Sequence, residues 1–243
     1  MKKLFTLMAM FATLACSIAC DPANTNEEDD DDEGEVKEAI VIDGQFADWA
    51  ALADCAVAAN TPGSPWDAVE QIRVYATTDF VFYYIRFKES KLAELLQSAD
   101  EELPIRLCIN TDSEFTSGYA NYFLEAYDYI IEGALAEGGA FTDFDGTLHQ
   151  RFSSWQELLK PGHNLVSGKG AGCEYEICLI RDVFNSALSA SDDPKPMGSS
   201  FETGIRFYYT GGGEWAELSN MPNSSAEEGD GNGWGHLLSI TAK

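Results

Sequence analysis

The sequence predicts an all-β fold, an antiparallel β-sandwich with a few short helices. Short runs rich in β-branched and aromatic residues recur along residues 39–243, and turn-rich loops separate them. Two of these runs, 72–75 and 80–87, are divided only by a short turn around Thr77 and Asp79, which is typical of a β-hairpin. Because residues 39–243 show no internal repeat and are numerous enough to bury a sizeable core, we expect them to form one domain.

The other elements follow from local patterns. Residues 39–42 are apolar and end at the turn pair Asp43-Gly44, so we expect a strand there. Residues 91–98 carry three leucines at helical spacing, which predicts a short surface helix. A further helical turn is expected at 181–187. The remaining strands are expected within residues 105–109, 122–132, 147–152, 174–180, 204–209 and 234–240.

Residues 1–19 have the three-part pattern of a secretory signal peptide. Two lysines precede an apolar stretch at residues 4–14, which is too short for a membrane-spanning helix of about 20 residues. Small residues then flank Ile18 directly before Cys20, which resembles the lipobox of bacterial lipoproteins. The resemblance implies that Cys20 receives the lipid, of the palmitate type, and begins the mature chain. Cys16 is a rival lipidation site, and a secreted protein cut near Ala19 is the plainer alternative.

Residues 20–38 form an acidic tether. Ten acidic residues stand against Lys37, and no apolar face is present, so we expect an extended segment without a core. An acidic run after the lipid-bearing cysteine is similar to the surface-export signal of lipoproteins in Bacteroidetes-type bacteria. The resemblance implies a lipid-anchored domain on the outer face of the outer membrane.

The charge of the chain narrows the class of partner. It has 41 acidic and 15 basic residues, a formal net charge of −26. Such a surface repels phosphate backbones, so we expect no nucleic acid partner. Neutral sugars, cations and basic proteins remain compatible with it.

Four cysteines follow the tether: Cys55, Cys108, Cys173 and Cys178. An extracytoplasmic location permits disulfides, and four cysteines allow three complete pairings, among which the sequence does not choose. Cys108 and Cys178 lie in expected strands, where a free cysteine is also an ordinary small core residue.

Five segments, in order, resemble family 9 carbohydrate-binding modules and the related DOMON-type β-sandwiches. They are IDGQFADW (42–49), FVFYYIRF (80–87), CINTDSEFTSGY (108–119), DYIIEG (128–133) and CEYEICLIRDVF (173–184). The resemblance implies a sandwich of the jelly-roll or immunoglobulin-like kind, a carbohydrate site built on tryptophans, and a structural calcium ion. Trp49 is expected to pack in the core, where it would plug one end of the sandwich.

Aromatic faces bind the apolar C–H surfaces of sugars, so loop tryptophans are the candidate platforms. Trp66 lies in a Gly-Pro-Ser context and Trp215 follows three glycines. We take these two as the first candidates and Trp155 as the third. For each of them, burial in the core is the alternative.

A calcium site is the candidate metal centre. Asn110, Asp112 and Glu114 alternate along one loop, and oxygen ligands at such spacing suit a hard cation. The loop is not an EF-hand, because Phe115 stands where glycine is required. A distant carboxylate, Asp128, would complete the site. The alternative is a loop in which Asn and Asp bond their own backbone.

The sequence gives no catalytic residues. Its three histidines lack metal-ligand spacing, and the glycine-rich residues 168–172 lack the spacing of a phosphate loop. Pairs such as Glu174 and Glu176 could serve a glycosidase, but chance pairs are expected in so acidic a chain. We therefore expect a non-catalytic surface lipoprotein that binds carbohydrate. The alternative is a structural or protein-binding lipoprotein without a sugar site.

Overall fold

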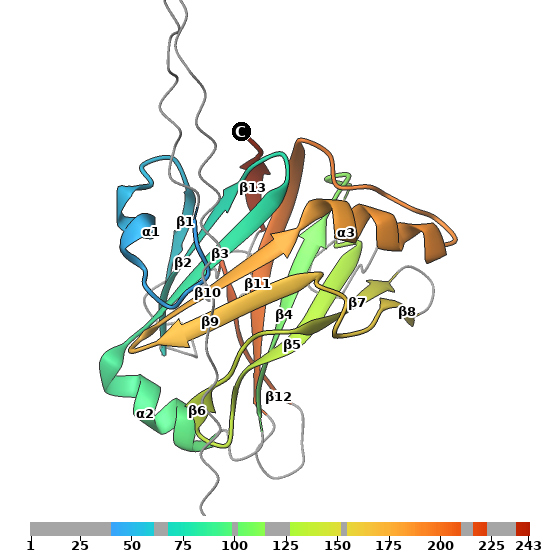
Figure 1. Cartoon of the computed structure of the whole chain (residues 1–243). Coiled ribbons are helices and arrows are strands. Elements are labelled where there is room, and N and C mark those ends of the chain that lie inside the picture. Colours follow the sequence, from blue (N-terminus) through green and yellow to red (C-terminus); the bar gives the residue numbers. More distant parts are fainter. Residues whose placement is uncertain are drawn as a thin grey trace, which may run out of the picture. The chain divides into compact units, whose positions relative to one another are not determined.

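The computed structural model describes residues 40–60, 68–98, 102–114, 127–151, 155–209, 216–222 and 237–243 (Figure 1). The chain divides into two units, residues 1–37 and residues 38–243, and every described residue lies in the second. This unit has two antiparallel sheets and few short helices. The predicted all-β sandwich is therefore confirmed.

The smaller sheet has five strands in the order β1-β2-β3-β10-β9. In that order they span Ala56–Ala59, Val69–Ala76, Phe80–Phe87, Glu174–Ile180 and Val166–Ala171. The predicted hairpin is confirmed as β2 and β3, in which Ala76 pairs with Val81. Strand β9 contains the glycine-rich run. A Cβ on Gly170 would lie 2.4 Å from Tyr175 and 2.7 Å from Phe141, so glycine allows these rings to pack over the strand.

The larger sheet has the order β12-β11-β4-β5-β7-β8. These strands span Ala216–Met221, Ser200–Tyr209, Glu102–Asn110, Tyr129–Glu137, Gly146–Arg151 and Trp155–Leu159. The first half of β11 pairs with β13 (Leu238–Thr241) and the second half with β12. The short β6 (Ala140–Phe141) pairs with the end of β5.

The described residues also contain three short α-helices and one 3-10 turn. They are α1 (Ala47–Ala51), α2 (Glu89–Ser98), α3 (Arg181–Ala187) and η1 (Leu188–Ala190). The predicted helices at 91–98 and 181–187 are confirmed as α2 and α3. Among the described residues, no helix combines the length and the apolar character that crossing a membrane requires.

One predicted strand is wrong. Within 39–42, the described residues from Ile40 onward belong to no sheet. The Val41 N–H donates to the Asp48 carboxylate at 3.0 Å instead of to a neighbouring strand. The apolar side chains of Ile40 and Ile42 still pack, but against the outer face of the smaller sheet. Apolar character alone therefore did not distinguish a docked segment from a strand.

The main core lies between the two sheets and draws alternate residues from each. Tyr83 of β3 and Thr203 of β11 are both fully buried, and their hydroxyls are 2.9 Å apart. Phe87 of β3 meets Phe207 of β11 edge-on, with ring centroids 6.4 Å apart. Because β3 and β11 belong to different sheets, these contacts join the two layers (Figure 1).

A second, smaller core covers the outer face of the smaller sheet. Trp49, which is 1% exposed, packs there with Phe82 and Tyr84. The ring centroids of Trp49 and Tyr84 are 5.3 Å apart. The expectation that Trp49 is buried is confirmed, but it lies on the face of the sheet and does not plug an end. The reason is that α1 begins only after the Asp43-Gly44 turn has brought the chain over β3 and β10.

The buried carboxylate of Glu176 holds this segment in place. One of its oxygens accepts the N–H groups of Asp43 at 2.9 Å and Gly44 at 2.8 Å. The other oxygen accepts the indole N–H of Trp49 at 3.1 Å. Burial raises the pKa of Glu176, although the three donors oppose that shift. Gly44 has φ +80°, a conformation that glycine adopts without strain.

Removing the Glu176 carboxylate should destabilise the domain. We expect Glu176→Ala to lower the free energy of unfolding by about 2–4 kcal/mol, because three donors would lose their acceptor inside the protein. Urea unfolding followed by circular dichroism measures this. Glu70→Ala is the matched control, since Glu70 forms a half-exposed ion pair with Arg86 and should change stability by less than about 1 kcal/mol. Equal effects of the two substitutions would contradict the role given to Glu176.

Candidate functional site

The outer face of the larger sheet carries the candidate site. Along β4, Ile105 and Leu107 point into the core, so Arg106 between them lies on the opposite face. Arg106 pairs in register with Glu132 of β5, which places both side chains side by side on that outer face. Their side chains are 21% and 27% exposed. This face therefore presents a partly exposed charged pair beside a buried apolar cluster of Cys108, Ile130 and Tyr127.

Trp155 lies at the edge of this face, on β8. It is 41% exposed, and it is one of only four large hydrophobic side chains that are exposed in the described part of the chain. Its ring lies 4.4 Å from that of His149, with 36° between the planes. The Arg106 guanidinium lies 5.5 Å from its centroid. One part of the ring is thus packed against polar neighbours while another part remains open to solvent.

Arg106 connects the members of the site. Its Nε donates to Glu132 Oε2 at 2.5 Å, and its Nη1 donates to the Tyr208 hydroxyl at 3.1 Å. The guanidinium also lies 4.6 Å from the centroid of the Tyr208 ring. Burial lowers the pKa of Arg106, but Tyr208 and Glu132 more than offset that effect and raise it. The guanidinium is therefore charged and held in a fixed position.

His149 lies beneath Trp155 and is nearly buried. It makes no hydrogen bond to any described residue, and its Nδ1 is shielded from solvent. Burial lowers its pKa, and Arg106 adds to this effect, whereas Glu132 and Glu157 oppose it. His149 is consequently a neutral ring at pH 7 and packs as an aromatic support for Trp155.

These groups form a surface with the chemistry of sugar recognition. A partly open indole face suits the C–H surface of a pyranose, and fixed charged groups beside it suit hydroxyls. Arg106 and Tyr208 supply donors, and Glu132 supplies acceptors. The arrangement offers stacking and hydrogen bonding within one patch.

The tryptophan predictions can be compared with the structure only in part. Trp155 lies exposed at the site, so the alternative of core burial does not apply to it. Trp66 and Trp215 lie outside the described residues, and their role stays a prediction.

Arg106 and Glu132 were not among the predicted site residues. The available signal was a charged residue inside each of two apolar strands, at positions that face away from the core.

The predicted calcium ligands lie together around a buried carboxylate. Asp128 is fully buried, and its Oδ2 accepts the Thr111 N–H at 2.9 Å and the Thr111 hydroxyl at 2.8 Å. Asn110 accepts the Ser113 N–H at 3.0 Å and donates to a Glu202 oxygen at 3.1 Å. This is the self-bonded loop that the sequence offered as the alternative.

A lysine ammonium already lies between two of these carboxylates. Lys195 Nζ is 2.5 Å from Asp112 Oδ2 and 3.5 Å from Asp128 Oδ1. Glu114 is exposed and donates its N–H to the other Asp112 oxygen at 2.9 Å. Within the described ranges, no group of three or more His, Cys, Asp or Glu side chains is arranged to hold a metal ion. Calcium binding stays a prediction, and calcium would compete with Lys195.

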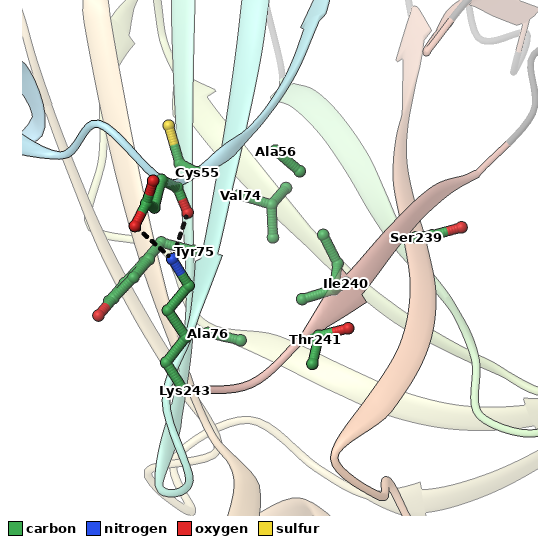
Figure 2. A pocket seen from close by; sticks show the side chains of 10 residues that line it. Cys55, Ala56, Val74, Tyr75, Ala76, Ser239, Ile240, Thr241 and Lys243 are labelled. Carbon is green, nitrogen blue, oxygen red and sulfur yellow. Dashed lines mark hydrogen bonds and ion pairs between the residues drawn. The ribbon is translucent and has the colours of Figure 1, made fainter.

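A pocket of about 340 Å³ opens elsewhere, between β1, β2 and β13. Figure 2 shows its lining side chains, among them Tyr75, Cys55 and Lys243. Lys243 Nζ lies 2.9 Å from the Asp54 carboxylate, so this cation is already neutralised. Tyr75 stacks on Phe82 in the neighbouring strand, with ring centroids 6.4 Å apart. The pocket therefore combines fewer recognition groups than the face around Trp155.

All four cysteines after the tether are described, and all are free thiols. Cys108 and Cys178 are buried, in agreement with ordinary core residues. Burial raises the pKa of Cys178 to about 11, so this thiol stays protonated at neutral pH. The Sγ of Cys55 accepts a hydrogen bond from Arg73 Nε at 3.0 Å. None of the three possible pairings is formed.

No known family model matches the chain, and a comparison with curated proteins found no match either.

The calcium prediction can be tested together with Lys195. We expect Lys195→Ala to lower the melting temperature in chelator, because Asp112 and the buried Asp128 would lose their countercharge. Millimolar calcium should restore part of the lost melting temperature of Lys195→Ala. The melting temperature of the unaltered chain should change little on adding calcium. Lys160→Ala is the control, since Lys160 makes only an exposed ion pair with Glu157. A large rise in the melting temperature of the unaltered chain on adding calcium would instead show that the ion displaces the Lys195 ammonium.

Proposed function

We propose that this protein is a non-catalytic lipoprotein that binds carbohydrate through the outer face of its larger sheet. The observation that carries the proposal is the exposed ring of Trp155 beside the Arg106–Glu132 pair. Solvent-exposed aromatic rings flanked by fixed polar groups are how proteins bind sugars without chemical change. The family resemblance of the β-sandwich segments supports the same reading. The net charge of −26 disfavours nucleic acid as the ligand.

The proposed location is the outer face of the outer membrane. The lipobox ending at Cys20 and the acidic residues 21–38 support lipid anchoring and surface export. In that arrangement the tether keeps the sugar-binding domain away from the lipid headgroups. The domain would hold a glycan or polysaccharide close to the cell for partner proteins that process or import it.

Trp155→Ala should weaken carbohydrate binding. We expect a loss of affinity of about 5- to 150-fold for any glycan that the domain binds, since one aromatic platform contributes about 1–3 kcal/mol. A glycan array with residues 38–243, which form a unit with its own core, identifies the ligand. Isothermal titration calorimetry then compares the variants.

Phe80→Ala is the matched control for this experiment. Phe80 is a second exposed aromatic, 37% exposed, but it lies on the smaller sheet. The Phe80→Ala domain should bind the glycan with the affinity of the unaltered domain. If no glycan on the array binds, the structural or protein-binding alternative is favoured. If Phe80→Ala loses binding and Trp155→Ala does not, the site lies on the other sheet.

Lipid attachment has its own test. We expect mass spectrometry of the mature protein to show a chain that begins at Cys20 and carries acyl chains. Cys20→Ser should release the protein from the membrane fraction, whereas Cys16→Ser should not, because Cys16 would be removed with the signal peptide. Protease treatment of sealed cells should digest the anchored domain. A domain that survives this treatment is not on the cell surface.

A further inference from the structure

We infer that His149 positions the Trp155 ring only while its imidazole is uncharged, so that mildly acidic solution weakens ligand binding at Trp155. This inference rests on the proposed function and adds a regulation to the same site. Three features of the site carry it: the contact between the two rings, the burial of one imidazole nitrogen, and the charges around the imidazole.

His149 and Trp155 form the stacked part of the site. Their ring centroids are 4.4 Å apart and their planes meet at 36°, so one face of the indole lies against the imidazole. His149 is 7% exposed, whereas Trp155 is 41% exposed. The indole therefore has one face supported by His149 and other parts open to solvent. Because a stacked ligand needs an aromatic ring in a fixed position, its affinity depends on this support.

The imidazole of His149 has no place for a second N–H group. Its Nδ1 is shielded from solvent and makes no hydrogen bond to any described residue. A neutral imidazole carries one N–H, but an imidazolium carries an N–H on both nitrogens, so Nδ1 would then be a buried donor without an acceptor. Such a donor is unfavourable, above all on a charged ring. Protonation therefore favours another position of the ring, in which Nδ1 reaches water or a carboxylate, and Trp155 loses its support.

Ionisable residues neighbour His149 on each strand of this face. They are Arg106 on β4, Glu132 on β5, Glu157 on β8, and Arg151, which lies two positions further along β7 and pairs in register with Trp155. Burial is the largest influence and lowers the pKa of His149; the two glutamates oppose this effect and Arg106 adds to it. Each glutamate already has a cation beside it, Arg106 for Glu132 and Lys160 for Glu157. Arginines stay charged in mild acid, so they add no titration of their own.

Attraction between an imidazolium and the indole face is the opposing effect, because cations bind aromatic faces. The Arg106 guanidinium already lies 5.5 Å from the centroid of the Trp155 ring. An imidazolium stacked on that ring would thus lie close to a first cation, and this guanidinium also disfavours protonation of His149. With burial and Arg106 acting in the same direction, the neutral ring is the one that fits under Trp155.

Ligand and proton should therefore oppose each other at this site. A sugar stacked on Trp155 requires the supported position of the indole, in which His149 is neutral. By thermodynamic linkage, the ligand must lower the pKa of His149 to the same extent that protonation weakens ligand binding. An affinity that is tenfold weaker corresponds to a pKa that is lower by about one pH unit.

NMR spectroscopy of the labelled domain of residues 38–243, without ligand, tests the coupling of the two rings. A titration from about pH 7.5 to about pH 5 follows the His149 ring and the Trp155 indole N–H. These signals are assigned by their loss in His149→Phe and Trp155→Phe. We expect the Trp155 signal to move with the His149 titration, and to stay in place over the same range in His149→Phe. A Trp155 signal that does not follow His149 would overturn the inference.

Calorimetry at the same two pH values then measures binding, with hexamers of glucose, xylose, mannose and galacturonate as the probes. We expect the affinity for any probe that binds to fall about tenfold between about pH 7.5 and about pH 5. His149→Phe keeps an aromatic ring without a titrating group, so its affinity should change by less than about twofold over the same interval. His149→Ala should bind more weakly than His149→Phe at both pH values, because it removes the support.

His163→Gln is the matched control, since His163 is exposed in the turn before β9. It should keep the pH dependence of the unaltered domain. An equal fall in affinity in the unaltered domain and in His149→Phe would overturn the inference and leave the sugar-binding proposal intact, and so would an affinity of the unaltered domain that does not change with pH. Absence of binding to every probe at both pH values would overturn the proposed function and, with it, the release of a sugar. If His149→Phe fails to fold, the NMR titration of the unaltered domain decides.

Discussion

The buried carboxylate of Glu176 is the constraint on which the arrangement of this domain depends. It is the acceptor for a turn and an indole that precede it by more than a hundred residues. A buried carboxylate is stable only when its oxygens accept hydrogen bonds. The Glu176 carboxylate therefore requires the donors of residues 43–49 in their observed place, and those donors require the carboxylate. Arg73 strengthens the same docking, because its two terminal nitrogens donate to the carbonyls of Trp49 at 2.5 Å and Leu52 at 2.7 Å. The N-terminal part of the domain is thereby fixed over one sheet.

This docking makes the two outer faces of the sandwich different. On the smaller sheet, Trp49 and its neighbours cover Phe82 and Tyr84, so that face becomes a second core. On the larger sheet, Cys108 and Ile130 are buried with Tyr127, but Arg106 and Glu132 are partly exposed and need solvent or a polar ligand. A ligand surface is therefore expected only where the outward positions are polar and partly open. Trp155 lies at the edge of that second face.

The sequence predicts the fold well because the fold rests on local patterns. The hairpin of β2 and β3, the helix α2 and the strand β10 all follow from the spacing of apolar residues. Strand β8 was missed because WQELL does not alternate and forms an edge of the sheet. The partnership of Arg106 with Glu132 and the role of Glu176 depend on register between distant strands, which composition does not encode. The Lys195 ammonium beside Asp112 follows equally from tertiary contact, since the two residues are 83 positions apart in the sequence.

Several of the few cations in this acidic chain bind groups of the protein itself. Arg181 donates to the carbonyls of Thr77 and Gly198, each at 2.5 Å, and joins the β2–β3 turn to the segment before β11. Lys195 neutralises the Asp128 loop, and Arg106 binds its own sheet face. With 15 basic residues against 41 acidic ones, the chain carries a large excess of negative charge. A ligand that carries its own negative charge would meet this field, which disfavours its approach.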